Sequence, residues 1–297
     1  MAATRRLKEL LAATSPRLEL PDGPVVVALS GGADSAALAL LCMEARSEVS
    51  AIHIDHQLSA SPMLARAASA VAARLGISLK VRQVVIDVGP SPEDKARHAR
   101  YEVFARSPQP LLTAHTRDDN VETILINLIR GTGSSGLAGI PPFRPPRIHR
   151  PILELTRNET RELSSLAGLP FRDDPMNDDM TLTRNKIRLE ILPMMRELNP
   201  EVDAALARAA ATLRRDIEYL DDQAAPLYEG ALPLSVLTTA PRVLADRLLR
   251  RALEESGVGV TSDRIDRMWS VVCGESERQE LAGGRAAVRR GAMLVIE

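Results

Sequence analysis

The chain has 297 residues, enough for one large domain or for two ordinary ones of roughly 100–200 residues each. Its 45% hydrophobic and 26% charged residues are typical of a globular protein, and two cysteines, Cys42 and Cys273, exclude a disulfide scaffold and a cysteine-rich zinc site. The net charge of −1 gives no overall sign of a nucleic-acid partner, and no apolar run approaches the roughly 20 residues of a membrane helix. We therefore expect a soluble, cytoplasmic protein without a membrane partner.

Short apolar runs alternate with helical patterns in the first half of the chain. The runs that predict buried strands are Val25–Leu29, Val49–Ile54, Leu79–Ile86 and Leu111–Ala114. The helical patterns are an amphipathic N-terminal segment of residues 1–14, Ser35–Arg46, Ser61–Leu75, Pro92–Arg106 and Asp118–Arg130. This alternation indicates βαβ units and predicts an α/β fold, with a parallel, Rossmann-like sheet and helices on both faces. Ligands of such sheets bind beyond the carboxyl ends of the strands.

The segment after the fourth strand is rich in residues that interrupt regular structure. Gly131–Gly139 is rich in Gly and Ser and is either a plain connector or a mobile loop beside a nucleotide site; Pro141–Pro151 holds five prolines and is predicted to be unstructured. Further helices are predicted at Leu155–Gly168, Thr181–Leu198, Val202–Ala225, Pro241–Glu255 and Ser262–Val272, with short strands around Gly283–Gly284 and Gly291. A change of composition near Asn199 divides a first domain of residues 1–198 from a smaller, mostly helical domain of residues 199–297.

The turn between the first strand and the first helix carries the clearest chemical signal. Two glycines let the backbone turn tightly and come close to an anion, and the positive end of the following helix favours negative charge. The candidate phosphate-binding residues are Ser30, Gly31, Gly32, Ala33, Asp34 and Ser35. The motif is neither GxxxxGK[ST] nor GxGxxG. The alternative is a glycine-rich turn in which Asp34 only complements the helix end.

In its strand–loop–helix setting, this motif resembles the SGGxDS signature of the N-type ATP pyrophosphatases, the PP-loop superfamily. The resemblance implies a loop that holds the pyrophosphate of ATP and an enzyme that cleaves ATP between the α- and β-phosphates. It does not select a member of the superfamily, because synthetases and several RNA-modifying enzymes share the signature.

Further motifs narrow the choice. They are His53-Ile-Asp55-His56, Ala96-Arg97 with Arg100-Tyr101, Thr113-Ala-His115, Asp118-Asp119-Asn120-Val-Glu122, Arg130-Gly131, Arg150-Pro151, Asp173-Asp174-Pro175 and Arg184-Asn185-Lys-Ile-Arg188. From about residue 24 to residue 200 this ordered set resembles the tRNA(Ile)-lysidine synthetases, and the remaining residues resemble the short form of that family. Gln57 departs from the pattern, since a glycine is common there; we expect a changed turn and unchanged chemistry.

The resemblance implies a reaction in two steps. ATP adenylates the C2 oxygen of the wobble cytidine in an isoleucine tRNA with a CAU anticodon, and the ε-amino group of free L-lysine then attacks C2 and expels AMP. The protein must hold pyrophosphate, supply Mg²⁺ and accept a proton from the lysine ammonium, which is not nucleophilic in water.

On this resemblance, four residues are the catalytic candidates. Asp34 is assigned to Mg²⁺ beside the pyrophosphate. Asp119 and Glu122 share a helix face and could bind the lysine ammonium, act as general base or ligate metal. The alternative is that they only complement the helix end after Thr116. Arg97 is assigned to the triphosphate, with a surface salt bridge as its alternative.

The remaining candidates would bind ATP and tRNA. His56 and His115 are assigned to ATP, although a lone histidine is more often structural. The candidate tRNA-binding residues are Arg144, Arg147, Arg150, Arg184, Asn185 and Arg188. The last three could instead bind the α-phosphate of ATP or lie on a solvated helix face. Because methionine tRNA shares the CAU anticodon, discrimination must use other parts of the tRNA, and the region after residue 200 is the expected reader. The sequence leaves open whether the protein forms a homodimer.

Two other functions are compatible with parts of this sequence. A PP-loop tRNA thiolase is disfavoured, because that chemistry uses paired cysteines and the two cysteines here lie far apart in sequence without a CxxC motif. A non-catalytic nucleotide- or RNA-binding module on the same fold would bind ATP without turnover. The presence of Asp34, Asp119 and Glu122 argues against such a module.

Overall fold

The computed structural model describes residues 2–45, 48–55, 57, 61–84, 103–104, 106–228 and 230–297. The chain forms two compact units. The first comprises Met1–Ile126 and Ile140–Ala207, and the second comprises Asn127–Gly139 and Arg208–Glu297. The structural division therefore follows Ala207 and places one earlier segment in the second unit. The functional boundary expected near Asn199 stays a prediction.

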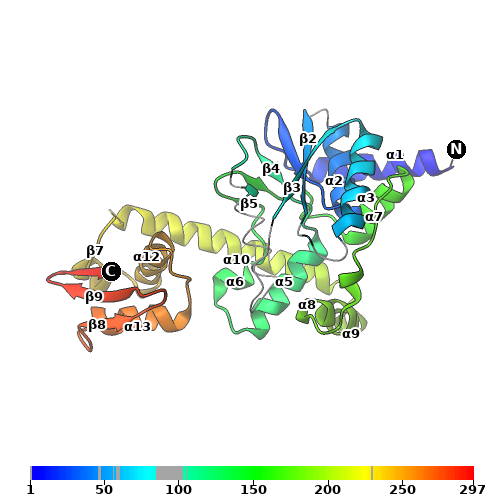
Figure 1. The fold of residues 1–297 in the computed structure, drawn as a ribbon. Helices are drawn as coiled ribbons and strands as arrows, with labels where there is room; N and C mark the ends of the chain where they lie inside the picture. Colours follow the sequence, from blue (N-terminus) through cyan, green and yellow to red (C-terminus); the bar gives the residue numbers. More distant parts are fainter. Residues whose placement is uncertain are drawn as a thin grey trace. The chain divides into compact units, whose positions relative to one another are not determined.

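A six-stranded sheet with the order β3-β2-β1-β4-β6-β5 forms the centre of the first unit (Figure 1). Its strands are β1 (Val25–Ala28), β2 (Val49–Asp55), β3 (Ser78–Gln83), β4 (Leu111–Leu112), β5 (Phe143–Arg144) and β6 (Ile148–His149). Neighbouring strands are parallel except for β5 and β6, which are antiparallel. The predicted parallel sheet is confirmed.

Side chains alternate between the two faces of the sheet along each strand, and helices pack on the apolar side chains. The helices of this part are α1 (Ala2–Thr14), α2 (Ala33–Glu44), α3 (Ser61–Leu75), α5 (Arg117–Ile129) and α7 (Arg157–Leu166). Val25 and Val27 are fully buried in one core cluster with residues of α1, α2, α3 and α7. Val26 and Ala28 pack in a second cluster with Phe104. The predicted helices are confirmed, except that Pro92–Arg106 lies mostly outside the described residues.

Helix α2 is enclosed on all sides, which fixes the position of its N-terminus. Its residues from Ala36 to Cys42 are buried, and most of them are alanine or leucine. Ser164 of α7 donates a hydrogen bond to the Ala33 carbonyl oxygen (2.8 Å). The loop that precedes α2 is therefore attached to a rigid helix.

The prediction of an unstructured segment at Pro141–Pro151 is wrong. Strands β5 and β6 form a hairpin there, and β6 extends the sheet because Ile148 pairs with Leu111 of β4. The prolines are compatible with this arrangement, since they flank the short strands and Pro145–Pro146 lies between them, where no ladder donor is needed. Within Gly131–Gly139, the four residues Ser134–Leu137 form the short helix α6.

The predicted helix Thr181–Leu198 consists of three parts. They are α8 (Thr183–Lys186), a π-helical turn (Ile187–Ile191) and α9 (Leu192–Leu198). Pro193 has no N–H to donate, so the hydrogen-bond register widens ahead of it. Ile187 and Leu192 pack against Val121 and Leu125 of α5, which brings α8 and the π-turn onto that helix.

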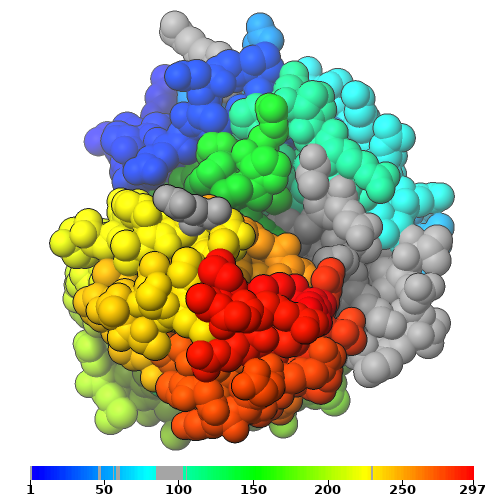
Figure 2. Space-filling model, turned by 90° about the vertical axis from the view of Figure 1, so that its left-hand side faces the viewer, coloured from blue at the N-terminus to red at the C-terminus, as the bar shows by residue number. Residues whose placement is uncertain are grey.

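The second unit combines helices with a small antiparallel sheet of the order β7-β10-β9-β8. Besides α6 and most of α10 (Val202–Ala224), its elements are β7 (Leu232–Pro233), α11 (Leu234–Thr239), α12 (Arg242–Glu255), α13 (Ser262–Val272), β8 (Arg278–Glu280), β9 (Ala286–Arg290) and β10 (Met293–Ile296). Figure 2 shows the end of the chain, in red, at the surface of this unit. Its hydrophobic core includes Leu248, Leu253 and Met268. Within the described part of the chain, none of the helices has the length and apolar character required to cross a membrane.

Candidate functional site

The predicted phosphate-binding loop and the predicted carboxylates follow two neighbouring strands. Residues 30–35 come after β1, and residues 113–119 come after β4, which pairs with β1 in parallel. The chain adds β2 and β3 on one side of β1, and β4 and β6 on the other. The strand order therefore reverses between β1 and β4, and ligands of open α/β sheets bind at such a point.

The loop after β1 turns at Gly31, whose φ of 93° is a conformation that L side chains rarely adopt. An added Cβ would overlap the Leu64 carbonyl oxygen in α3. The Gly31 carbonyl oxygen also accepts a hydrogen bond from Arg172 N (2.9 Å). The turn is held from both sides, and the fold itself requires glycine at this position.

Gly32 differs from Gly31, because its backbone is ordinary. It is the N-cap of α2 with φ of −87°, and an added Cβ would meet nothing closer than Ser30 Oγ at 3.6 Å. The hydroxyls of Ser30 and Ser35, 2.9 Å apart, brace the loop. The free space at Gly32 therefore adjoins the N–H groups at the start of α2. This arrangement is a cradle for an anion such as phosphate.

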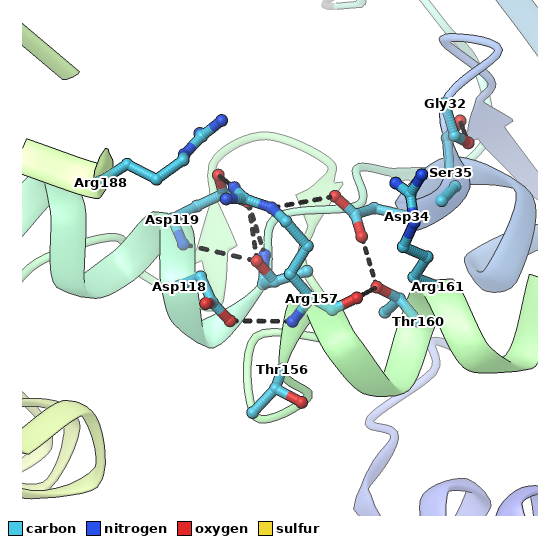
Figure 3. A network of polar contacts seen from close by, with 12 residues as sticks. Gly32, Asp34, Ser35, Asp118, Asp119, Thr156, Arg157, Thr160, Arg161 and Arg188 are labelled. Carbon is cyan, nitrogen blue, oxygen red and sulfur yellow. Dashed lines mark hydrogen bonds and ion pairs between the residues drawn. The ribbon is translucent and has the colours of Figure 1, made fainter. Parts of the chain in front are cut away.

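The N-termini of α5 and α7 meet beside Asp34 (Figure 3). Asp119 Oδ2 accepts hydrogen bonds from the backbone N–H (2.9 Å) and the hydroxyl (3.0 Å) of Thr116, which closes the first turn of α5. Asp118 Oδ2 accepts one from the backbone N–H of Arg157 in α7 (2.8 Å). Oδ2 of Asp119 thus stabilises the helix end, which is the alternative role considered for this residue. Oδ1 faces the site and accepts a hydrogen bond from Arg157.

Arg157, the first residue of α7, places its guanidinium among three carboxylates (Figure 3). Its Nη2 donates to Asp119 Oδ1 at 2.9 Å, and its Nη1 donates to Glu122 Oε1 at 3.3 Å. Its Nε lies 3.9 Å from Asp34 Oδ2. Burial lowers the pKa of Arg157, but the surrounding carboxylates outweigh burial and raise it above the ordinary value. The group stays charged and connects the acid of the loop with the two acids of α5.

Glu122 is enclosed by guanidinium groups, and its side chain is only 1% exposed. Arg188 binds it through two hydrogen bonds, Nε to Oε1 at 2.7 Å and Nη2 to Oε2 at 3.0 Å. Arg184 Nε lies 3.8 Å from Oε2. The structure therefore places these two predicted tRNA-binding arginines beside the carboxylate cluster.

Asp34 lies in an environment that disfavours its ionised form. Its Oδ1 accepts a hydrogen bond from the hydroxyl of Thr160, which also lies 2.9 Å from the Arg157 carbonyl oxygen. Burial, together with the negative charges of Asp119 and Asp118, raises the pKa of Asp34 to about 6, although Thr160 and Arg157 act in the opposite direction.

A magnesium ion fits this site only together with a nucleotide. Among the described residues, no three His, Cys, Asp or Glu side chains converge on a point that could hold a metal ion. Mg²⁺ bound with a nucleotide uses one or two carboxylates, since phosphate oxygens and water complete its shell. Asp34 lies in the first turn of α2 beside the free space at Gly32, and its pKa of about 6 leaves it ionised at neutral pH. It fits as such a ligand.

His115 lies at the edge of the cluster. Its Nδ1 is 3.0 Å from Thr113 Oγ1. Burial raises the pKa of Asp119, but Arg157 and His115 outweigh it and hold this pKa below the ordinary value. The structure thus brings His115 near the carboxylates, and its assignment to ATP stays a prediction.

Two of the predicted residues, His56 and Arg97, lie outside the described residues, and their roles stay predictions. The neighbouring Gln57 is described, and its φ is 56°. Its backbone N–H donates to Asp55 Oδ1 (2.8 Å), which supports the turn. A glycine is expected there because the backbone has this left-handed conformation.

The predicted tRNA-binding residues have very different environments. Arg144 and Arg147 are exposed on the β5–β6 hairpin. Arg150 is 3% exposed and donates to the Pro141 carbonyl oxygen (2.6 Å). Asn185 is 4% exposed and donates to two backbone carbonyl groups. Arg150 and Asn185 are therefore buried groups that hold the local backbone, and their assignment to tRNA stays a prediction.

Arg157 and Thr160 of α7, which contact Asp34, are not among the residues predicted from the sequence. A signal was present, because Thr156 and Glu159 form the T-x-x-E pattern of a capping box, which the structure contains. That pattern places Arg157 at a helix N-terminus, where the helix dipole disfavours a cation. An arginine in that position indicates nearby acids.

Fold and site together define the class of the protein, a PP-loop enzyme that uses ATP, and a family model described as a PP-loop domain matches residues 1–195. The tRNA(Ile)-lysidine synthase of Nocardia farcinica is 39% identical over 250 residues, which cover 81% of this chain and 78% of that protein. The protein of the same name from Mycobacterium bovis is 36% identical over 292 residues, covering 91% and 90%. The chain belongs to the tRNA(Ile)-lysidine synthase family.

A solved structure shows the same fold at lower identity. It is the U34-tRNA thiolase NcsA from Methanococcus maripaludis with its [4Fe-4S] cluster. The match has 19% identity and a TM-score of 0.57, and it covers 71% of this chain and 80% of that one. The cysteines of the present chain lie in different units, Cys42 buried in α2 and Cys273 exposed after α13.

Proposed function

We propose that this protein is a carbon–nitrogen ligase that makes lysidine in the cytoplasm. It uses ATP to activate the wobble cytidine of an isoleucine tRNA with a CAU anticodon, and joins free L-lysine to C2 of that base. The observation that carries the proposal is the placement of a phosphate cradle at Gly32 beside Asp119 and Glu122, with one guanidinium contacting the acids of both parts. Membership of the tRNA(Ile)-lysidine synthase family supports the choice of substrate.

The first step converts a poor leaving group into a good one. The C2 oxygen attacks the α-phosphorus of ATP, an O–P bond forms, and pyrophosphate leaves. The N–H groups at the start of α2 would bind the leaving pyrophosphate, with Gly32 leaving room for its oxygens. Asp34 would hold Mg²⁺, which neutralises charge on the phosphates when it is bound.

In the second step, the lysine nitrogen attacks C2, a C–N bond forms and AMP leaves. The substrate ammonium must lose a proton first, because its ordinary pKa is about 10.4. Asp119 and Glu122 would bind the ammonium and take up this proton. Asp119 suits binding of the ammonium, because Thr116 holds only its Oδ2 while Oδ1 contacts a cation.

Recognition of the tRNA would use exposed arginines. Arg144 and Arg147 lie on the β5–β6 hairpin of the unit that holds the phosphate cradle. Isoleucine and methionine tRNAs with the same anticodon would be distinguished through the region after residue 200. Deletion of that region is an unsuitable test, because Asp203 and Leu206 belong to the first unit, where they contact Arg196 and the core beside α5.

Transfer of radiolabelled L-lysine to an unmodified isoleucine tRNA transcript with Mg·ATP tests the proposal. We expect label on this transcript alone, none on a methionine tRNA transcript, and none with Asp34→Ala. Pyrophosphate release without incorporation of lysine would indicate a different tRNA modification. ATP binding without turnover would indicate a non-catalytic module.

A further inference from the structure

Arg157 occupies the position that the proposed function requires for a substrate cation. Its guanidinium contacts Asp119 and Glu122, the two acids expected to bind the lysine ammonium, at 2.9 and 3.3 Å. Its Nε also lies 3.9 Å from Oδ2 of Asp34, which is the acid of the phosphate loop. The side chain is 26% exposed, so it is reached from solvent, whereas Glu122 beneath it is not.

The two acids that would bind the ammonium already have cationic partners. Asp119 pairs with Arg157, and Glu122 pairs with Arg157, Arg184 and Arg188. A lysine ammonium at these acids would have to compete with a resident cation. Departure of one guanidinium makes the cluster more negative by one charge, which is the complement of an ammonium.

The structure allows Arg157 to leave while the acids stay in place. Its backbone is fixed at the start of α7 by the bond to Asp118, so movement is confined to a long, flexible side chain. Asp119 keeps its two bonds from Thr116, and Glu122 keeps both bonds from Arg188. The carboxylates would therefore remain ordered for a new cation.

We propose that Arg157 is a resident substitute for the substrate ammonium and that ATP removes it. Phosphates bound in the cradle beside Asp34 attract the guanidinium toward the loop, which frees Asp119 and Glu122 for the amine. Lysine then binds tightly only after ATP, so the amine does not occupy the site before there is an activated base to attack. This inference rests on the proposed function. Arg157 acts in it as a positioning residue.

Calorimetric titration of the full-length protein with L-lysine tests this role. The titrations are made with and without the magnesium salt of α,β-methylene-ATP, which cannot be cleaved between the α- and β-phosphates. For the unchanged protein we expect lysine to bind at least about tenfold more tightly with the analogue, a coupling within the usual allosteric range. Thermodynamic linkage requires that saturating lysine increase the affinity for the analogue by the same factor.

Arg157→Met should reduce this ratio to less than about threefold, because lysine meets no resident cation in the nucleotide-free variant. If Arg157→Met does not fold, Arg157→Lys takes its place. The lysine ammonium contacts fewer acids than the guanidinium group, so the affinity ratio of this variant should lie between those of the unchanged protein and Arg157→Met. Arg6→Met is the matched control, since Arg6 is 55% exposed and pairs with Glu162 of α7, which lies outside the capping box. It should keep the original ratio.

An equal ratio in the unchanged protein and in a folded Arg157 variant would overturn the inference, whether the shared ratio is large or equal to one. So would lysine affinity in Arg157→Met that is weaker than the original without nucleotide. Failure of the proposed function is recognised separately, because the unchanged protein would then transfer no lysine to the isoleucine transcript.

Discussion

Asp34 combines two demands that conflict within one side chain. Its burial and the neighbouring acids raise its pKa to about 6, so at neutral pH it is ionised against the preference of its surroundings. An ionised carboxylate is what a magnesium ion with bound phosphates requires. Residues that lower the stability of the fold are common at functional sites.

Replacement of Asp34 by asparagine should stabilise the free protein at alkaline pH. Because the folded pKa lies above the ordinary 3.8, the stabilising contribution of the protonated acid is complete below about pH 4 and is lost as the pH rises through 6. We expect the free energy of unfolding of Asp34→Asn to exceed the original by about 1–3 kcal/mol at pH 8. The difference at pH 5 should be about half of that at pH 8, because pH 5 lies between the two pKa values.

Urea unfolding at pH 5 and pH 8 measures this difference. Equal differences at the two pH values would show that the charge of Asp34 is not the cause. Lysine transfer by Asp34→Asn should be lost at both.

The two loop glycines should respond differently to alanine. Gly31→Ala places a Cβ against the Leu64 carbonyl oxygen at a φ of 93°, so it should destabilise the protein by about 2 kcal/mol or more. Gly32→Ala meets free space, so it should change the unfolding free energy by less than about 1 kcal/mol and still weaken ATP binding at least tenfold. Thermal melting and ATP titration of both variants separate the effects. Unimpaired ATP binding by Gly32→Ala would count against the cradle.

Helix α7 is the element that connects the parts of the site. It begins at a capping box, binds Asp118 of α5 through its first N–H, and contacts Asp34 through Thr160. The side chain that bridges the acids extends from its first residue. The geometry of the cluster therefore depends on where this helix begins.

Loss of the cap should consequently affect activity as well as stability. Thr156→Ala removes the side chain that accepts the Glu159 N–H, which should cost about 1 kcal/mol of unfolding free energy and lower lysine transfer several-fold. Thr261→Ala, at the start of α13 in the second unit, removes a similar cap and should cost about the same stability. Denaturation and transfer assays compare the two. Equal activities would mean that the start of α7 does not control the site.

Local patterns predicted most elements but not the associations that depend on distant partners. The apolar run Val25–Leu29 indicates a buried strand by itself, and β1 is that strand. The β5–β6 hairpin was missed because its pairing with β4 outweighs the local effect of the prolines. For the site, the loop and the acids were found by their position after strands, whereas Arg157 needed the contact between α5 and α7.

The whole molecule carries its charges unevenly, with 18 basic and 14 acidic residues in residues 1–150 and 20 basic and 25 acidic in the remainder. A net charge of −1 means that binding of tRNA must use local groups of arginines. In the second unit, Arg285 and Arg289 make no side-chain ion pair within the described part of the chain. Arg290 of the same strand is paired with Glu297.

Substitution of Arg285 and Arg289 by alanine should weaken tRNA binding and leave ATP binding unchanged. If each contacts one phosphate, the salt dependence of the tRNA dissociation constant should fall by about one unit of slope per arginine removed. Arg290→Ala should have a smaller effect, because its charge is already compensated. Filter binding at several salt concentrations measures the slopes. An unchanged slope in the double variant would exclude this strand from the tRNA surface.

The segment Asn127–Gly139 belongs to the second unit although it lies between two stretches of the first. Arg214 of α10 donates to the Ala138 carbonyl oxygen (2.8 Å), which attaches this segment to the later part of the chain. The second unit is therefore not a portable module. A chimaera that exchanges only the residues after Ala207 between relatives would combine one parent's 127–139 with another parent's C-terminal part. Recombination between family members should preserve function only when both pieces are inherited together.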